Sequence, residues 1–299
     1  MNHLSPDRLL QTGLAFRASK AMLSAVELGL FTELGRGPRT VAQLRRSLAV
    51  NERAAADLLD ALVAMGVLDR EGDDAQAVYL NTREAGYFLD QRSPAYVGAI
   101  LEAANTRLYA LWGELTVLLK TGKPISGVDT ISSSGTVSPS RSGSGSAIET
   151  LMEQFDFSTR RTLAYFGRGG DSLAVLLAAW HPHLQCRCVD PRDALPRVDV
   201  IVMVEVLPDG NLEGKRDLLR RAYAALPAGG CLIAIEALID DERRRNLFAL
   251  LASIDAALQT GGGFGFSGSD LHQWCLGVGF RGTEVIPLTG ISSAVVALK

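Results

Sequence analysis

The sequence lacks the features of a secreted, membrane or nucleic-acid-binding protein. Only four of its 299 residues are cysteines, and they do not form the disulfide framework of a secreted domain. No apolar run reaches the roughly 18 residues of a membrane span, and the N-terminus lacks a signal-peptide pattern. The formal net charge of −3 provides no basic excess to attract nucleic acid or an anionic membrane. These absences predict a cytoplasmic protein with no nucleic-acid or membrane partner.

Metal-ligating clusters are also scarce. Cys186 and Cys188 would place both thiols on one face of a strand, but a metal site needs a wider spacing and a second pair of ligands. We therefore predict no metal site.

What is present is enough apolar residue for a packed core, 47% of the chain against 21% charged residues. In the N-terminal part, apolar spacing predicts helices over 7–35, 41–48 and 52–65, with Thr40 and Asn51 as caps of the second and third. A hairpin over 67–80 follows. The order of three helices and a hairpin is that of a winged helix.

The winged-helix order has two interpretations, DNA binding and dimerisation. The helix that would enter the DNA groove and the hairpin that would be the wing are both acidic, with one arginine each, Arg53 and Arg70. Because carboxylates facing phosphates weaken binding, the dimerisation interpretation is favoured. The acidic residues are Glu52, Asp57, Asp60, Asp69, Glu71, Asp73 and Asp74.

Composition divides the chain into three parts. Helical spacing resumes over 94–120, and residues 131–146 are rich in serine and glycine with little to bury, which predicts a linker. The predicted parts are an all-helical, winged-helix-like dimerisation domain (1–122), a flexible linker (123–147) and an α/β domain (148–299).

The C-terminal part alternates strands and helices, which predicts a doubly wound parallel sheet. Helices are expected over 148–154, 172–180, 213–226, 242–258 and 270–278, between strands over 162–166, 184–189, 198–204, 231–236, 283–287 and 293–298. Only 191–198 connect the second strand to the third, too few residues for a helical crossover. The sheet is therefore predicted to be trimmed by a helix and a strand.

A glycine-rich turn follows the first strand of this sheet. Gly167, Gly169 and Gly170 lie between an apolar strand and a helix, a layout that brings backbone N–H groups close to a nucleotide-like ligand. Asp190 ends the next strand, where an acid can bind ribose hydroxyls. These four residues are the candidate cofactor site.

In this order of parts the chain resembles the S-adenosylmethionine-dependent O-methyltransferases of the caffeic-acid and hydroxyindole type, including bacterial relatives in natural-product pathways. The resemblance covers nearly the whole chain. It implies a Rossmann-like methyltransferase domain, an N-terminal dimerisation domain, a small-molecule substrate and S-adenosylmethionine as cofactor. It rests on the glycine turn, Asp190, Leu111–Leu115, Thr121–Pro124, Phe155–Ser158, Pro227–Gly230 and Ser267–Phe280.

The chain departs from the family pattern where the chemistry is expected. The turn has Tyr165, Arg168 and Asp171 in place of the family's leading acid and two glycines, although Asp171 is suited to cap a helix starting at Ser172. The family's general-base histidine aligns with Pro208. These departures predict that S-adenosylmethionine binding is lost unless the ancestral site survives.

Three acids remain as catalytic candidates. Glu236 matches a family acid, Asp209 lies beside Pro208, and Asp255 interrupts an apolar helix that lines the substrate pocket in the family. A buried acid has a raised pKa and can transfer protons. A third family acid aligns with Gly265.

Three functions follow from these observations. The first is a cofactor-independent tailoring enzyme, for a cyclisation, elimination or rearrangement, on a scaffold that has lost methyl transfer. The second is a non-catalytic subunit that pairs with a related methyltransferase-like chain, and the third is a functional small-molecule O-methyltransferase. The predicted assembly is a homodimer or such a heterodimer.

Overall fold

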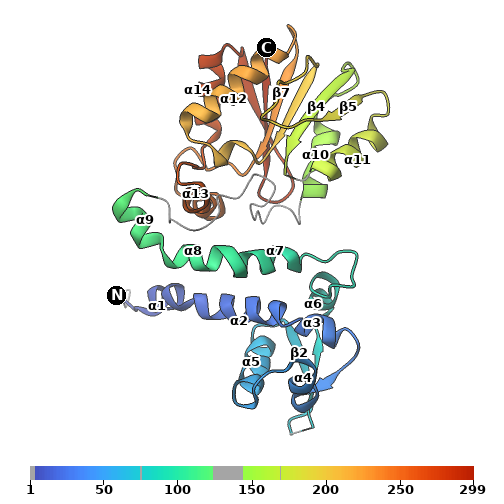
Figure 1. Ribbon diagram of the computed structural model, residues 1–299, viewed down its shortest axis with the longest axis vertical. Helices are drawn as coiled ribbons and strands as arrows, with labels where there is room; N and C mark the ends of the chain where they lie inside the picture. Colours follow the sequence, from blue (N-terminus) through green and yellow to red (C-terminus); the bar gives the residue numbers. More distant parts are fainter. Residues whose placement is uncertain (1–3, 75, 124–143, 169) are drawn as a thin grey trace. The chain divides into compact units, whose positions relative to one another are not determined.

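The computed structural model describes residues 4–74, 76–123, 144–168 and 170–299 (Figure 1). The chain forms two compact units, Met1–Ala110 and Leu111–Lys299, which are considered separately. Most of the predicted linker, 124–143, lies outside the described residues, and α10 (Ser144–Gln154) begins at its C-terminal end.

The first unit has the predicted winged-helix elements. Thr40 caps α4 with a complete capping box, and the Asn51 side chain accepts a hydrogen bond from Arg53 N at the start of α5. The single helix predicted over 7–35 is instead three helices, because it is interrupted at Ala15 and the chain turns at Gly29, whose φ is +70°. The helices are α1 (Asp7–Leu14), α2 (Phe16–Glu27), α3 (Leu30–Leu34), α4 (Val41–Leu48) and α5 (Glu52–Ala64).

The predicted hairpin of this mainly helical unit is present, with one further short strand beside it. β1 (Arg39–Thr40) pairs with β3 (Val78–Asn81), which pairs with β2 (Leu68–Glu71), so the predicted hairpin is part of a small antiparallel sheet. Arg70 on the wing lies 3.1 Å from Asp60 of α5, and the Tyr79 hydroxyl donates to the same carboxylate. The one arginine of the wing is therefore neutralised within the domain.

Helices complete the first unit and begin the second. The helix predicted over 94–120 begins at Gly98 and is divided into α7 (Gly98–Ala103), the π-helix η1 (Ala104–Leu108), α8 (Tyr109–Gly113) and α9 (Leu115–Thr121). Before them, α6 (Arg83–Phe88), which the sequence did not predict, is capped by Thr82.

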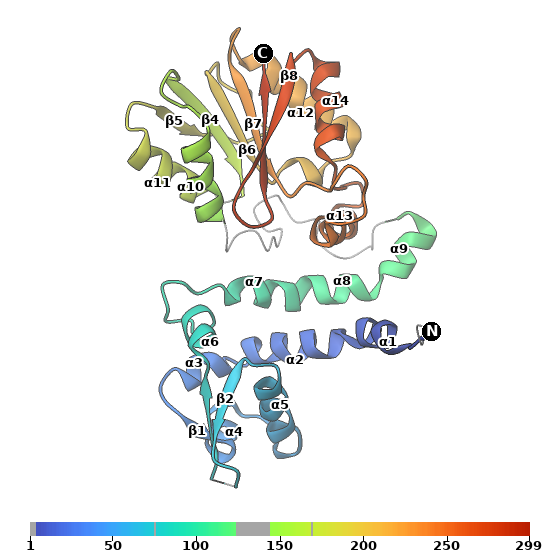
Figure 2. The ribbon, with the colours of Figure 1, turned by 180° about the vertical axis from the view of Figure 1, so that it is seen from behind.

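In the second unit the described residues form a six-stranded sheet in the order β5-β4-β6-β7-β9-β8 (Figure 2). Five strands run in one direction, but β9 is antiparallel to both of its neighbours, a departure from the all-parallel prediction. The strands are β4 (Thr162–Gly167), β5 (Gln185–Cys188), β6 (Val200–Val204), β7 (Cys231–Glu236), β8 (Gly282–Pro287) and β9 (Ser293–Leu298).

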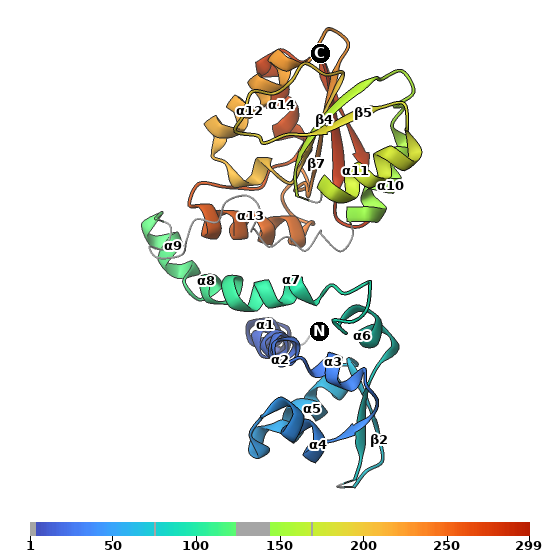
Figure 3. The same cartoon turned by 45° about the vertical axis from the view of Figure 1, so that its right-hand side comes forward.

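Helices cover both faces of this sheet. α10 and α11 (Gly170–Trp180) lie on one face, α12 (Leu212–Ala225) and α14 (Gly268–Val278) on the other, and α13 (Leu247–Thr260) lies near the carboxyl ends of the parallel strands (Figures 1 and 3). Alternate residues of β6 enter the two apolar cores, Val200 and Val202 on one face, Ile201 and Met203 on the other. The doubly wound layout is thus confirmed.

The trimmed crossover is also present as predicted. Neither a helix nor a strand lies between β5 and β6, where residues 189–199 are irregular. The helix predicted from residue 242 begins only at Leu247, because the Asp240 carboxylate accepts hydrogen bonds from three backbone N–H groups and holds the preceding turn. No helix in the described part of the chain is long and apolar enough to cross a membrane.

Candidate functional site

The candidate site residues of the second unit gather at the carboxyl ends of four parallel strands, where open α/β sheets bind ligands. Gly167 ends β4, Asp190 follows β5, Asp209 lies in the short helix η3 (Leu207–Asp209) after β6, and Glu236 ends β7. The topology therefore brings together the candidate cofactor residues and two of the three candidate catalytic acids.

Gly167 is required by the packing of β4 against β6. Its φ is +107°, and a Cβ there would lie 2.1 Å from the carbonyl oxygen of Val204. Gly170 is already the first residue of α11, so Asp171 lies inside the first helical turn and not, as predicted, before the helix. Gly169 lies outside the described residues. The turn is thus a tight strand-to-helix connection whatever it binds.

Arg168 joins the glycine turn to the segment after β6. Its backbone N–H donates to Val204 O at 2.8 Å, and its guanidinium donates to Glu205 O at 2.9 Å and to Asp209 Oδ2 at 2.6 Å. The side chains of Arg168 and Asp209 are 12% and 23% exposed. Asp209, a candidate catalytic acid, is therefore engaged by an arginine that stands in place of a family glycine.

Glu236 is almost completely buried. One carboxyl oxygen accepts the backbone N–H groups of Val206 at 3.2 Å and Leu207 at 3.1 Å, while Oε2 has no hydrogen-bond partner among the described residues. Burial, and secondly the nearby Glu205, raise the pKa of Glu236 to about 8. Near neutral pH this acid is therefore largely protonated and holds the turn that contains Pro208.

Lys215 holds the same turn from α12. Its ammonium donates to Leu207 O at 2.7 Å and Gly210 O at 2.5 Å, and lies 3.9 Å from the centre of the Phe264 ring. Burial lowers the pKa of Lys215 to about 8. The sequence analysis missed this residue, although Lys215, Leu219 and Ala222 share the buried face of α12 at helical spacing.

At Pro208 and Gly265, where the family has a histidine and an acid, neighbouring backbone and side-chain atoms lie close by. Pro208 O accepts Phe264 N at 2.9 Å, and a Cβ on Gly263 would lie 2.5 Å from the same oxygen. A Cβ on Gly265 would lie 3.0 Å from Ser253 Cβ. Both positions are therefore tightly packed.

Asp190 presents a different environment. Its carboxylate is paired with Arg192 at 2.5 Å and accepts Arg192 N at 2.8 Å, and the two side chains are 36% and 84% exposed. The hydrogen bonds from Arg192 lower the pKa of Asp190 to about 2. Asp190 is therefore ionised and partly accessible, and its partner is an exposed side chain.

Asp255, the remaining candidate acid, lies on α13. It accepts a 2.6 Å hydrogen bond from the indole Nε1 of Trp112. Burial raises the pKa of Asp255, and the bond from Trp112 opposes this rise. The sequence identified the acid, but its partner lies 143 residues away and has no local signal.

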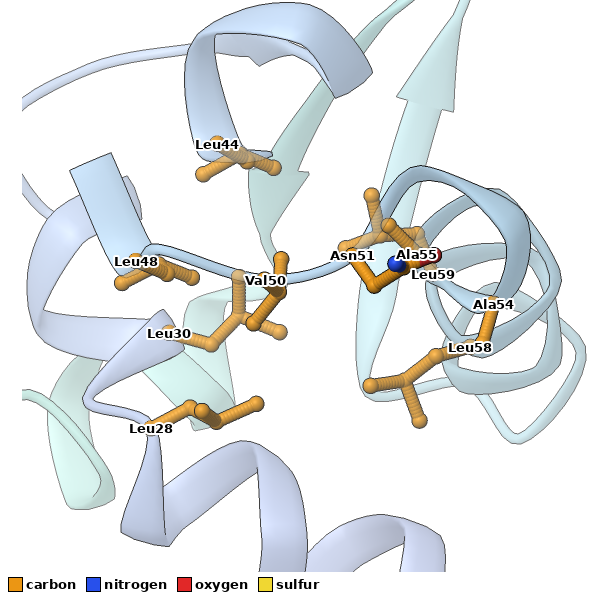
Figure 4. A pocket seen from close by; sticks show the side chains of 10 residues that line it. All are labelled: Leu28, Leu30, Leu44, Leu48, Val50, Asn51, Ala54, Ala55, Leu58 and Leu59. Atoms are coloured by element: carbon orange, nitrogen blue, oxygen red, sulfur yellow. The ribbon is translucent and has the colours of Figure 1, made fainter. Parts of the chain in front are cut away.

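Besides a cavity lined by residues of α6, two cavities among the described residues offer binding space. One of about 260 Å³ lies beside the short connection after β5, with Pro191, Arg192, Leu207 and Lys215 in its lining. The other, of about 170 Å³, lies in the first unit (Figure 4). Its only polar lining residue is Asn51, the cap of α5, so it offers no chemistry. No cluster that could hold a metal ion occurs among the described residues.

Comparison with known proteins places this geometry in a family. A model of the O-methyltransferase dimerisation domain matches residues 10–91, and a model of the O-methyltransferase domain matches residues 190–281. The chain is 30% identical to the tetracenomycin polyketide synthesis 8-O-methyl transferase TcmO of Streptomyces glaucescens, over 98% of this chain and 97% of that one. The chain belongs to the O-methyltransferase family. The predicted resemblance is confirmed.

Other O-methyltransferase-family comparisons agree. The N,N-dimethyltransferase OxyT of Streptomyces rimosus is 29% identical over 78% of each chain. The crystal structure of human N-acetylserotonin methyltransferase in complex with SAM has the same fold, with a TM-score of 0.86 at 24% identity over 100% of this chain and 99% of that one. The match to the family's catalytic-domain model begins at Asp190, so it leaves out the glycine turn.

Proposed function

We propose that this chain transfers a methyl group from S-adenosylmethionine to a hydroxyl group of a small aromatic molecule in a natural-product pathway. The observation that carries this proposal is the accessible, ionised carboxylate of Asp190 at the carboxyl end of β5. The names of TcmO and OxyT support methyl transfer over our first hypothesis, a scaffold that has lost it. They also give no support to the expectation that the protein has no cofactor.

The residues present fit the nucleoside end of this cofactor. Asp190 would accept the ribose hydroxyls, and the cavity of about 260 Å³ beside it offers room for a base. The backbone of the glycine turn would contact the rest of the molecule, and S-adenosylmethionine would supply an activated methyl group. Arg168 fits less well, because its guanidinium already spans from β4 to Asp209.

Among the candidate acids, Asp255 is the one we assign to the substrate proton. Asp209 is paired with Arg168, and Glu236 is buried against backbone N–H groups. Asp255 is only partly buried, its pKa is raised, and Trp112 fixes one of its oxygens. A carboxylate tuned in this way can accept a proton from an acidic phenol without the histidine that Pro208 replaces.

Calorimetric titration with S-adenosylmethionine tests the cofactor assignment. We expect wild-type affinity in about the micromolar range and a loss of about tenfold or more in Asp190→Asn, because charge-assisted hydrogen bonds to ribose disappear. Asp193→Asn, an exposed aspartate of the same connection, is the matched control and should bind as wild type. No binding by the wild type would reject the proposal.

The catalytic assignment is tested separately with hydroxylated naphthalenes and anthraquinones as acceptors. Formation of S-adenosylhomocysteine should fall in Asp255→Asn while affinity for S-adenosylmethionine is unchanged. Glu236→Gln should retain most of the rate. Equal rates for wild type and Asp255→Asn across pH 6–9 would reject Asp255 as the proton acceptor.

A second candidate, a protein that does not methylate, is favoured by one observation. Arg168 and Asp209 bind each other where the family's loop and base segment meet, and Pro208 supplies no titratable group. Such a protein would act as a cofactor-independent enzyme or as a non-catalytic subunit beside a related chain. Conversion of a pathway intermediate without S-adenosylmethionine would identify the first, and co-purification only with a paralogue the second.

For assembly we propose a homodimer through the first unit. The dimerisation-domain match covers residues 10–91, and α1 buries none of its residues within the chain. Leu9, Leu10 and Phe16 are more than half exposed at 77%, 57% and 53%. Light scattering after size exclusion should give twice the chain mass, and a heterodimer would form only with a related chain present.

A further inference from the structure

Beyond the backbone ladder of β4 and β6, one side chain joins the residue after β4 to the turn after β6. Arg168 stands at the end of β4 and Asp209 lies 41 residues further along, yet their charged groups are 2.6 Å apart. The same guanidinium binds Glu205 O, and Glu205 has a left-handed backbone with φ of +51°. A left-handed glutamate is strained, so the arginine holds a conformation that the local sequence disfavours.

We propose that the Arg168–Asp209 ion pair couples the end of β4 to the turn of residues 205–209, so that loosening one of them also loosens the other. Arg168 is a positioning residue in this proposal, and Asp209 acts through it. A consequence, which rests on the proposed function, is that Asp209 controls affinity for the nucleoside ligand although Asp190 is the residue that binds it.

The surrounding charges explain why the pair is needed. Glu205, which follows β6, and Glu236, which ends β7, lie near Arg168. Lys215 contacts the turn after β6 from α12. Without Arg168, Asp209 would lose its ion-pair partner, and the nearby Glu236 would lose a positive charge that lowers its pKa. Without Asp209, the guanidinium would keep its bond to Glu205 O but lose its only carboxylate partner within salt-bridge distance in the described residues.

The turn after β6 is also held by residues other than Arg168, so the contribution of the ion pair can be measured separately. Glu236 and Lys215 hold residues 206–210 from β7 and α12, and neither touches the glycine turn through a hydrogen bond among those described. If the ion pair only added local stability, removing Asp209 would loosen only its own turn. Coupling predicts a response on β4 and at the start of α11 as well.

Hydrogen exchange of the full-length protein without ligand tests the coupling. In Asp209→Asn and in Arg168→Met, peptides that cover the end of β4 and the start of α11 should exchange about tenfold faster, as should peptides over 204–210. The double variant should exchange no faster than either single one. Arg220→Met and Glu213→Gln remove an exposed pair on α12 and should leave both turns unchanged.

Faster exchange confined to 207–210 in Asp209→Asn would overturn the proposal, as would additive effects in the double variant. Asp209→Asn keeps the side-chain shape, so it decides the question even if Arg168→Met does not fold. Titration with S-adenosylhomocysteine then tests the ligand consequence, with at least about a fivefold weaker affinity expected for Asp209→Asn. Wild-type protein that fails to bind this probe would count against the proposed function, while hydrogen exchange would still decide the coupling.

Discussion

The ends of β4, β6 and β7 differ sharply from the end of β5, although all four strands reach the same edge of the sheet. At the first three, charged side chains of the chain bind one another and the backbone: Arg168 with Asp209, Glu236 with two N–H groups, Lys215 with carbonyl groups. At β5, Asp190 is partly exposed, and its carboxylate is bound by Arg192 of the same connection. We call the ends of β4, β6 and β7 the closed side, because their charged groups are bound within the chain, and the end of β5 the open side, where a ribose would bind.

The difference shows that residues which depart from a family motif can have structural work of their own. Arg168 replaces a glycine of the turn but supplies bonds to two segments. Glu236 aligns with a family acid, and here it accepts hydrogen bonds from two backbone N–H groups of the turn that contains Pro208. A buried polar group generally needs hydrogen-bond partners, and one oxygen of Glu236 finds them in the backbone of this turn.

The largest expected effect on stability comes from a substitution at Gly167, where β4 approaches β6 most closely. Gly167→Ala would place a Cβ 2.1 Å from Val204 O at a φ of +107°, so the strand end must shift. We expect a loss of about 3 kcal/mol or more in the free energy of unfolding, measured by urea denaturation.

The matched control is Gly277→Ala. Gly277 lies within α14, and a Cβ there would meet no atom within 4 Å. Because alanine is the better helix former, the change should be neutral or stabilising by up to about 1 kcal/mol. Equal losses in the two variants would mean that the close approach at Gly167 is not the cause.

Lys215→Met is expected to have the next largest effect. Methionine can fill the space but cannot donate, so the buried carbonyl groups of Leu207 and Gly210 lose their partner. We expect a cost of about 2–3 kcal/mol, since buried unsatisfied acceptors carry most of their desolvation penalty. Arg216→Met, on the exposed face of the same helix, should change stability by less than about 0.5 kcal/mol. A neutral Lys215→Met would indicate that the turn does not depend on the ammonium.

The sequence predicted the scaffold well because the scaffold depends on local patterns. The alternation in β6 and β7, the caps Thr40 and Asn51, and the short connection after β5 are all visible in neighbouring residues. The break at Gly29 was missed although a glycine is a local signal for a helix end, whereas the left-handed Glu205 has no such signal in its neighbouring residues.

The site was only partly predictable because its partners are distant in sequence. Asp190, Asp209, Glu236 and Asp255 were found as acids, but not what each would contact. Arg168 with Asp209 and Trp112 with Asp255 lie 41 and 143 residues apart, and no spacing rule connects them. The same acid is a proton acceptor or a turn cap depending on a partner that the motif does not contain.

The protonation of Glu236 provides a prediction of intermediate size. Its pKa is about 8 in the folded protein against an ordinary value of 4.5, so the folded state binds more protons than the unfolded state between these values. Stability is therefore lost as pH rises through this window, by about 2 kcal/mol from pH 6 to pH 8. Glu236→Gln should remove most of this slope.

Denaturation midpoints at pH 6, 7, 8 and 9 measure the slope. Asp255 also has a raised pKa and contributes in the same direction, so Asp255→Asn is measured in parallel and should retain most of the wild-type slope. Lys215, with a lowered pKa of about 8, adds stability only as pH rises from 8 toward 10.5 and does not disturb the lower window. A wild-type slope that persists in Glu236→Gln would show that Glu236 is ionised throughout.

The smallest effect on stability is expected at the open side, from Arg192→Ala. The Asp190–Arg192 pair is exposed, and exposed pairs contribute little, so the melting temperature should not change measurably. The pKa of Asp190 should rise from about 2 toward its ordinary value, observable by carboxyl-carbon NMR, because the arginine hydrogen bonds are the main cause of its depression. With Arg192 absent, a ribose no longer competes for the carboxylate, and affinity for S-adenosylmethionine should rise up to about fivefold. Weaker binding in Arg192→Ala would mean that the arginine contacts the ligand itself, and the open side would then be built from two residues and not from Asp190 alone.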